Sequence, residues 1–391
     1  MGDDSQHSVS VDRNRPRRVA WATLVVGVVA AVIAACTTTP SGTPATTAPP
    51  TSSTSSTSST STVPDGDDAF TVVFVGDSEP RMRGNTDAEL RAYVANLVSY
   101  TTTRTAYFDV DGGTHRISPE LVILGGDISA DRDTSVSKDL PIWQQLYDNN
   151  ISFIAGFGNH DWEPRVWGDG SLGYSVAGEQ SNQSTTAFTR ATYQRSSDMS
   201  PDFSYAEFGP SSTNGPTTFL AEYKGVAVAN FNTFLYQPSY TFPFGWPLTC
   251  NLGTGGAGCA TFVSAEPQIN RLAGSLSTNP ARTTLFVQHY PIDTSPDWWD
   301  DYGASGTTVA QKQNRLLELM SRFDHTVLLT GHNHSAGHST FSYGGRVLDQ
   351  YVAPYFGGDN GVDTSRGGGF IALLVSPTRG ILEVKTIPGG I

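Results

Sequence analysis

Five short apolar segments, each followed at once by glycine and polar residues, constrain this sequence more than any other feature. Their length of four or five residues suits β-strands, and their continuous apolar character is typical of strands that are covered on both faces. The segments span residues 71–75, 121–124, 151–155, 284–287 and 326–329, and candidate helices span 87–100, 140–149, 266–276 and 310–322. Apolar strands that alternate with helices predict an α/β sheet covered by helices.

Two further segments, 217–234 and 370–386, are strand-like and contain turns at Lys224-Gly225 and at 378–380, so they are interpreted as hairpins. Hairpins add antiparallel strands, and a mixed sheet or two packed sheets therefore follow. Residues 162–212 are rich in Gly, Ser, Asn and aromatic residues without a clear period. This composition predicts a long loop region over one end of the sheet.

Polar blocks follow directly on the five apolar segments. Because ligands in open α/β sheets gather at the carboxyl ends of the strands, these blocks are expected to meet in space. Carboxylates, imidazoles and an amide oxygen are the donors that a pair of divalent or trivalent metal ions requires. The blocks are Gly76-Asp77-Ser78-Glu79, Gly126-Asp127, Gly158-Asn159-His160-Asp161, Gln288-His289-Tyr290-Pro291 and Gly331-His332-Asn333-His334.

The motifs GD, GGD, GNHD, QHYP and GHNH, in this order over residues 71–338, resemble the five blocks of the calcineurin-like metallophosphoesterases. Segments 217–233 and 266–276 look most like the purple acid phosphatase branch of that superfamily. The resemblance implies a four-layer α/β/β/α sandwich with two mixed sheets and a metal site at the carboxyl ends of strands. It also implies two divalent or mixed-valence ions of Fe, Mn or Zn.

A set of site residues follows from the same resemblance, residue by residue. The implied metal ligands are Asp127 bridging both ions, Asp77 and His334 on the first ion, and Asn159, His289 and His332 on the second. His160 would act as the catalytic acid, oriented by Asp161. Residues Arg81, Arg83 and His338 are candidate substrate contacts, and a solvated loop is the alternative for the two arginines.

Two positions depart from the pattern of the family. Glu79 stands where many members carry a histidine ligand, and an oxygen donor there favours a harder ion such as Fe(III) or Mn(II). The alternative is that Glu79 holds a metal-bound water and leaves the first site weaker. Ala130 stands where the purple enzymes carry a tyrosine ligand, which predicts a protein without tyrosinate-to-iron colour.

The implied function is hydrolysis of phosphate mono- or diesters by a hydroxide that bridges the two metal ions. The alternatives are a catalytically impaired, metal-containing surface binding protein and a nucleotide or cyclic-nucleotide phosphodiesterase. A formal net charge of −13 and a pI near 4.9 argue against duplex nucleic acid as a partner, because such proteins need a basic surface.

The N-terminus has the pattern of a bacterial export signal. Four arginines within residues 13–18 precede an apolar run over 19–35, and Cys36 follows in a sequence that resembles a lipobox. This predicts a signal peptide over 1–35, a lipid anchor at Cys36 that binds the outer side of the membrane, and an extracytoplasmic, cell-envelope address. An uncleaved membrane anchor is the alternative.

A tether rich in Ser, Thr and Pro covers 36–66, and the catalytic domain is expected over 67–391. Cys250 and Cys259 lie close together in a Gly-rich stretch, and an oxidising compartment favours a disulfide between them over two reduced thiols.

Overall fold

Two mixed β-sheets pack against each other in the computed structural model, which describes residues 68–78, 87–103, 107–128, 140–158, 161, 176–208, 218–231, 265–293, 309–357 and 368–388. All of these residues belong to a unit that spans Pro64–Ile391. Among them the strands form a five-stranded sheet, a seven-stranded sheet and a separate two-stranded hairpin made of β2 (Tyr107–Val110) and β3 (Gly113–Arg116).

The five-stranded sheet has the order β14-β13-β1-β4-β5. Its parallel strands are β1 (Phe70–Val75), β4 (Pro119–Leu124) and β5 (Ser152–Ala155). The antiparallel hairpin of β13 (Phe370–Ser376) and β14 (Gly380–Ile387) adds to the other side of β1.

The seven-stranded sheet has the order β11-β12-β10-β9-β8-β7-β6. Its parallel centre consists of β8 (Val226–Asn230), β9 (Thr284–Val287), β10 (Thr326–Thr330) and β12 (Arg346–Val352). Antiparallel strands extend it on both sides, namely β6 (Phe203–Glu207), β7 (Phe219–Tyr223) and β11 (Gly337–Tyr343).

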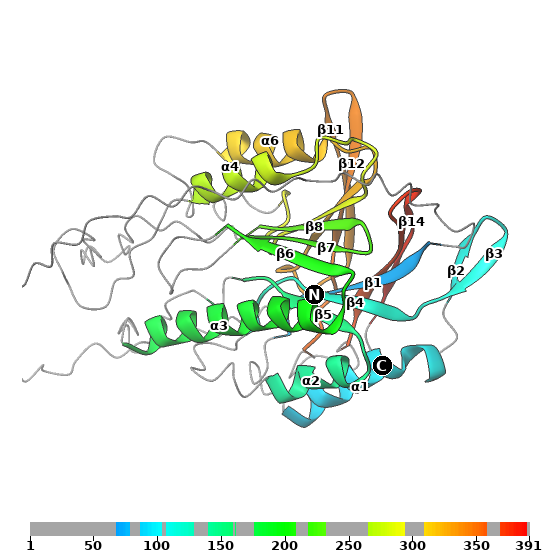
Figure 1. The fold of residues 1–391 in the computed structure, drawn as a ribbon, viewed down its shortest axis with the longest axis vertical. Coiled ribbons are helices and arrows are strands. Elements are labelled where there is room, and N and C mark those ends of the chain that lie inside the picture. Colours follow the sequence, from blue (N-terminus) through cyan, green and yellow to red (C-terminus); the bar gives the residue numbers. More distant parts are fainter. Residues whose placement is uncertain are drawn as a thin grey trace, which may run out of the picture. The chain divides into compact units, whose positions relative to one another are not determined.

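Side-chain alternation along the strands builds four layers. On β1, Val73 and Val75 pack on the side of helices α1 (Asp87–Thr103) and α2 (Leu140–Asp148), whereas Val72 packs between the two sheets. On β10, Leu329 faces the first sheet and Leu328 packs with α4 (Ala265–Ser275) and α6 (Val309–Met320). Figure 1 shows the two helix pairs on opposite sides of the paired sheets, which confirms the predicted α/β/β/α sandwich.

The predicted loop over 162–212 is wrong from residue 176 to residue 207, where a helix, α3 (Val176–Met199), and strand β6 lie. The buried face of α3 near its C-terminus is polar: Ser196 Oγ accepts the Phe153 N–H at 3.1 Å and donates to the Phe153 carbonyl at 2.9 Å. Thr192 Oγ1 accepts the Ala155 N–H at 3.1 Å. Hydroxyls that satisfy the edge of β5 replace apolar residues on this face, so the sequence shows no helical hydrophobic period.

The remaining strand and helix predictions are confirmed within a few residues. All five apolar segments are strands, the four candidate helices correspond to α1, α2, α4 and α6, and both hairpins form with turns at the expected places. No helix in the described part of the chain reaches the length and apolar character that crossing a bilayer demands.

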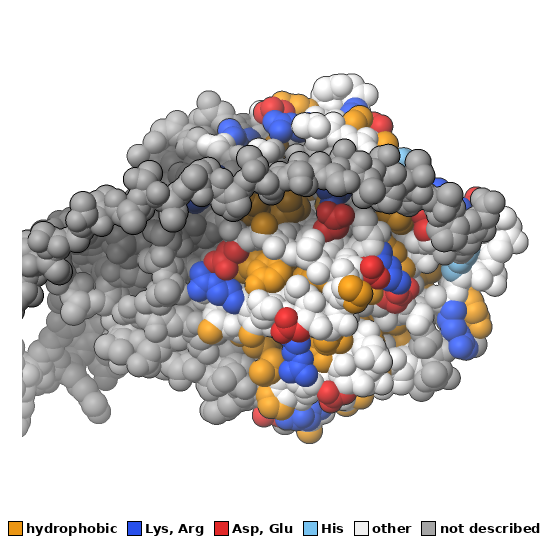
Figure 2. All heavy atoms as spheres, viewed as in Figure 1, with side chains coloured by type: hydrophobic (Ala, Val, Ile, Leu, Met, Phe, Trp, Pro, Cys, Tyr) orange, Lys and Arg blue, Asp and Glu red, His pale blue; other side chains and the backbone are white. Residues whose placement is uncertain are grey.

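The face shown in Figure 2 carries acidic and basic side chains side by side rather than a basic stripe among its described residues. Among the described residues, Arg190 pairs with Glu207 and Lys224 pairs with Glu120, each at 2.5 Å. Several predicted features lie outside the described residues and stay predictions: the signal over 1–35, the tether over 36–66, and residues Cys36, Glu79, Arg81, Arg83, Ala130, Asn159, His160, Cys250 and Cys259.

Candidate metal centre

Four strands from the two sheets end around one group of carboxylates and imidazoles. Asp77 follows β1 and Asp127 follows β4 in the first sheet, while His289 follows β9 and His332 and His334 follow β10 in the second. The sheets are tied together here, since His289 Nδ1 lies 3.0 Å from the carbonyl oxygen of Gly125, next to Asp127. Residues that are distant in the sequence therefore converge as predicted.

The centre of the group is buried and compact. Asp77, Asp127 and His289 have side chains with no exposed surface, and one ligand atom of each lies within 4.8 Å of the others. His289 Nε2 lies 3.1 Å from Asp127 Oδ2 and 3.8 Å from Asp77 Oδ1. His334 Nε2 lies 3.3 Å from Asp77 Oδ1, and the His332 ring centroid lies 5.2 Å from that of His289.

Three of these residues adopt a backbone conformation that is uncommon for residues with a Cβ. The φ angles of Asp127, His332 and His334 are 51°, 70° and 54°, all in the left-handed region. Asp77 supports the backbone turn that contains His332 and His334. Its carboxylate accepts the His332 N–H, and the His332 nitrogen lies 2.9 Å from Oδ2 and 3.1 Å from Oδ1. Strained backbone of this kind concentrates at functional sites, where the surrounding structure holds it in place.

Two glycines allow the carboxylates to approach neighbouring backbone. A Cβ at Gly158 would lie 2.0 Å from Asp127 Oδ1 and 2.3 Å from the Asp127 nitrogen. A Cβ at Gly331 would lie 2.7 Å from Asp77 Oδ2. Gly158 and Gly331 are therefore explained by close packing against the acidic side chains.

Asp161 has a role that the sequence did not indicate. Its buried carboxylate accepts the Ile128 N–H at 2.9 Å through Oδ1 and the Gly158 N–H at 2.8 Å through Oδ2. Asp161 thus joins the segment after β4 to the segment after β5, and thereby supports the position of Asp127. Its predicted role in orienting His160 stays a prediction.

The close contacts shift the pKa values of the buried groups. Burial would raise the pKa of Asp77, but a hydrogen bond with His334 and the positive charge of His289 hold it well below its usual range. Burial would likewise lower the pKa of His289, but the charge of Asp127, its hydrogen bond and the charge of Asp77 raise that pKa to about 9. Burial and the charge of His289 lower the pKa of His332 to about 4.

This donor set suits a metal ion. Two carboxylates buried side by side carry a large desolvation cost that nearby positive charge must offset. Carboxylate oxygens and imidazole nitrogens in contact with one another are also the ligands of Fe, Mn and Zn sites. The buried Asp77, Asp127 and His289 can therefore bind a metal ion, and His332 and His334 lie beside them.

His338 is the one candidate substrate contact that lies among the described residues, and it contacts Asp349 and Tyr351. Its Nε2 lies 2.8 Å from Asp349 Oδ1, and its ring stacks on Tyr351 with centroids 4.4 Å apart. A role in substrate binding stays a prediction.

Two aromatic residues at the site were not assigned a role from the sequence. Tyr290 belongs to the QHYP block, but nothing in the pattern indicated its contact with His332. Tyr355 stacks on His334 and follows β12, which the sequence did not single out as a strand that leads to the site. The sequence holds no clear signal for Tyr355, because apolar and polar residues do not alternate along the preceding strand Arg346–Val352.

No protein-family model matches the chain, and no curated protein matches it. Among solved structures, it is similar to a structure titled "GAP50 the anchor in the inner membrane complex of Plasmodium", with 14% identity, a TM-score of 0.36, and coverage of 83% of this chain and 90% of the other. It is also similar to the sulfate thiohydrolase SoxB of Thermus thermophilus in complex with glycerol, with 11% identity and a TM-score of 0.35. That match covers 83% of this chain and 57% of SoxB.

The strand order and the layers define the class of the fold. The two mixed sheets and the helices outside them form the predicted α/β/β/α sandwich, and the buried Asp–His group lies at the ends of its strands. Membership of the purple acid phosphatase branch stays a prediction.

Proposed function

We propose that this chain is a metal-dependent phosphoesterase that hydrolyses phosphate mono- or diesters. The observation that carries the proposal is the buried group of Asp77, Asp127 and His289, assembled from the ends of three strands in two sheets. A buried pair of carboxylates with an imidazole between them has little structural advantage over apolar residues, because charges cost free energy to bury. A bound cation would offset this cost.

The described residues suggest how two ions would be held. Asp127 contacts His289 and would bridge the ions, and Asp77 contacts His334 and would complete the first site with it. His289 and His332, with Asn159, would complete the second site. Bound ions would supply positive charge to the phosphate oxygens and lower the pKa of a water molecule.

The protein itself must supply a proton to the departing oxygen. We assign this step to the imidazole of His160, which follows Asn159 in the GNHD block. General acids of this kind contribute roughly 10² to 10⁴ in rate. Asp161, which follows His160 in the sequence, is held by hydrogen bonds from two backbone N–H groups.

Metal analysis combined with a panel of phosphate esters tests this function. We expect the purified chain to contain two equivalents of Fe, Mn or Zn, to lack purple colour, and to hydrolyse a chromogenic monoester or diester. The variant Asp127→Asn should lose metal and activity, whereas Asp349→Asn, at an exposed carboxylate, should lose neither. Comparison of monoester and diester turnover would identify the substrate class, and Glu79→His would test whether position 79 affects the first metal site.

Two results would contradict the proposal in different ways. A protein that is loaded with metal but inert toward every ester offered would be a metal-containing binding protein. A protein that binds no metal from solutions of Mn(II), Fe(II) or Zn(II) would have no metal centre at all.

The proposed setting is the outer side of a bacterial membrane, with Cys36 as the lipid anchor. The support is the sequence pattern of Arg-rich, apolar and Cys-containing segments at 13–36. Mass spectrometry of the membrane-bound protein should find Cys36 as a lipid-bearing N-terminal residue if Cys36 is lipidated. A chain that retains residues 1–35 and carries no lipid would favour an uncleaved anchor.

A further inference from the structure

The two imidazoles of the Gly331–His334 turn each lie against a buried tyrosine. The His334 and Tyr355 rings are stacked, with centroids 4.4 Å apart and planes inclined by 19°. The His332 and Tyr290 rings meet edge to face, with centroids 4.4 Å apart and planes inclined by 81°. Tyr290 and Tyr355 are 1% and 3% exposed, so these rings are themselves fixed by the packing around them.

The two histidines have reason to need such contacts. Both have left-handed backbone conformations, and both are only partly buried, unlike His289. An imidazole can rotate about its Cβ–Cγ bond, and a turn on the rim of a site restrains that rotation less than a closed core does. A neighbouring aromatic face therefore selects the ring plane, and with it the direction of the nitrogen lone pair.

The backbone that carries each tyrosine is tied to the site. Gln288 Nε2 donates to the Tyr290 carbonyl at 2.6 Å, and the following residues are held by Gln350, whose Oε1 accepts the Ile292 N–H at 2.7 Å and whose Nε2 donates to Asp293 Oδ1 at 2.8 Å. Next to Tyr355, the Phe356 N–H donates to the Asp77 carbonyl at 3.2 Å. The segment of Tyr355 thus contacts Asp77 directly, and Tyr290 directly follows His289 in the chain.

We propose that Tyr290 and Tyr355 are positioning residues that fix the ring orientations of His332 and His334 for metal binding. This inference rests on the proposed function, because it requires both histidines to be ligands. Removal of hydrogen-bonded partners of metal ligands typically changes metal affinity by about 10- to 100-fold, and we expect an effect of this order for a ring that orients its ligand.

The chain contains a matched control for the stack at the metal centre. His338 and Tyr351 are stacked with centroids 4.4 Å apart and planes inclined by 16°, nearly the same geometry as His334 and Tyr355. His338 is bound by Asp349 and not by Asp77. Loss of the Tyr351 ring therefore reports the general effect of removing a His–Tyr stack from this protein.

Cobalt(II) is a suitable probe, because its visible absorption responds to the number and arrangement of its ligands. The full chain, metal-free, is titrated with Co(II) as the unsubstituted protein and as Tyr355→Leu, Tyr355→Phe and Tyr351→Leu. We expect Tyr355→Leu to bind Co(II) about 10- to 100-fold more weakly and to show a changed absorption spectrum. Tyr355→Phe, which keeps the ring, and Tyr351→Leu should match the unsubstituted protein in both measurements.

The outcomes distinguish failure of the proposed function from failure of the positioning role. If the unsubstituted chain binds no Co(II), the proposed function and the positioning role are both overturned. If it binds Co(II) and folded Tyr355→Leu shows the same dissociation constant and spectrum, the positioning role alone is overturned. If circular dichroism shows that Tyr355→Leu does not fold, Tyr355→Met, with a flexible side chain of closer volume, replaces it. Tyr290→Leu then tests the contact with His332 by the same Co(II) dissociation constant and absorption spectrum.

Discussion

Two sets of Asp, His and Tyr side chains in this protein have almost the same local geometry and very different surroundings. The site set is Asp77, His334 and Tyr355, and the surface set is Asp349, His338 and Tyr351. In each set an imidazole Nε2 lies near an Asp Oδ1, at 3.3 Å and 2.8 Å, and the imidazole stacks on the tyrosine at 4.4 Å. The pair distances alone would not distinguish a metal site from a surface contact.

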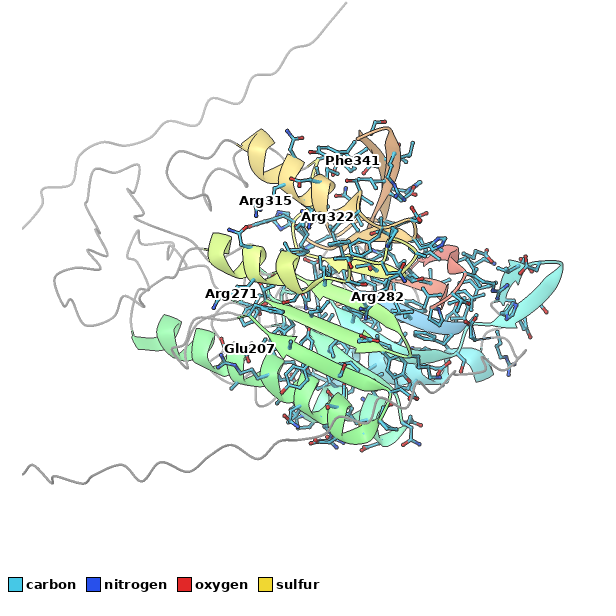
Figure 3. The ribbon with its side chains drawn as sticks, turned by 45° about the horizontal axis from the view of Figure 1, so that its top comes forward. Glu207, Arg271, Arg282, Arg315, Arg322 and Phe341 are labelled. Carbon is cyan, nitrogen blue, oxygen red and sulfur yellow. The ribbon has the colours of Figure 1, made fainter. Side chains whose placement is uncertain are left out.

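The surface set is a local product of strand pairing. His338 lies directly opposite Tyr351 in the antiparallel ladder of β11 and β12, so the stack is an ordinary cross-strand pair. Asp349 and His338 remain 43% and 47% exposed. On the other face of β11, Phe341, labelled in Figure 3, packs with the cluster under α6, and strand alternation therefore turns His338 away from that cluster.

The site set is assembled from three distant segments, after β1, after β10 and after β12, and Asp77 has no exposed surface. A second buried carboxylate, Asp127, and a buried imidazole, His289, complete its surroundings. A surface ion pair contributes little to stability because water solvates both partners, whereas buried charges carry a cost. Burial and a second carboxylate, rather than the His–Asp contact, therefore mark the candidate metal centre.

The largest expected effect comes from removing a buried carboxylate charge. Asp77→Asn keeps an oxygen that can accept the His332 N–H, but it removes a negative charge from the centre. We expect metal affinity to fall by more than about 100-fold, beyond what loss of an outer partner causes. Asp349→Asn should leave metal affinity unchanged, as measured by equilibrium dialysis. Equal losses of metal affinity in Asp77→Asn and Asp349→Asn would contradict the distinction between the site set and the surface set.

A methyl group at Gly158 tests whether Asp127 must occupy its observed position. The new Cβ would clash with the Asp127 side chain and backbone, so Gly158→Ala should destabilise the protein by about 1 to 3 kcal/mol and weaken metal binding. Gly274→Ala, in α4 with nothing within 4 Å of the new Cβ, should instead stabilise it by up to about 1 kcal/mol. Urea unfolding of both variants measures the difference, and a tolerated Gly158→Ala would contradict the close packing.

Metal binding should release a proton at neutral pH. In the metal-free protein the pKa of His289 is raised to about 9, so this imidazole is protonated at pH 7 and must lose its proton to become a ligand. The pKa of His332 is lowered to about 4, so it releases none. Calorimetry in buffers of different ionisation enthalpy should therefore find at least one proton released at pH 7, since a metal-bound water that becomes hydroxide adds to the proton from His289, and a metal affinity that rises with pH up to about 9.

The same pKa values set the pH dependence of the metal-free fold. Protonated His289 stabilises the folded state below its unfolded pKa of about 6.5, and this contribution is lost as the pH rises through about 9. Neutral His332 has the opposite sign: its contribution is present above about pH 6.5 and is lost as the pH falls through about 4. Metal-free stability that does not fall between pH 7 and pH 9.5 would contradict the raised pKa of His289.

The smallest effect is expected in the surface set. His338→Ala removes an exposed contact with Asp349, so we expect a change of at most about 0.5 kcal/mol in the free energy of unfolding and no change in metal content. Steady-state kinetics with an ester that the protein hydrolyses provide a second measurement. A raised KM with unchanged metal content would support His338 as a substrate contact, and unchanged kinetics would remove it from the candidates.

The strands that carry the site could be predicted because they are buried on both faces. Continuous apolar runs such as Val72 to Val75 indicate strands from composition alone, and the polar residues that follow them mark the strand ends. Helix α3 could not be predicted in the same way, since Thr192 and Ser196 face the edge of β5 with hydroxyls where an ordinary covered helix would have apolar side chains.

The site was partly predictable for a related reason. Metal-ligand types such as Asp127 and His289 follow strands in the sequence, whereas the supporting contacts depend on how distant segments meet. Tyr355 reaches His334 only because β12 lies beside β10 in the sheet, and Asp161 supports Asp127 through backbone N–H groups. No local pattern encodes such contacts, so only the structure identifies them.

Anomalous diffraction from crystals of the protein grown with Mn(II) tests the central claim most directly. The claim is that Asp77, Asp127, His289, His332 and His334 hold two ions. We predict two anomalous peaks about 3.5 to 4 Å apart, with the Asp127 carboxylate between them. Density for Mn(II) only at exposed carboxylates such as Asp349, with none beside Asp127, would contradict the account.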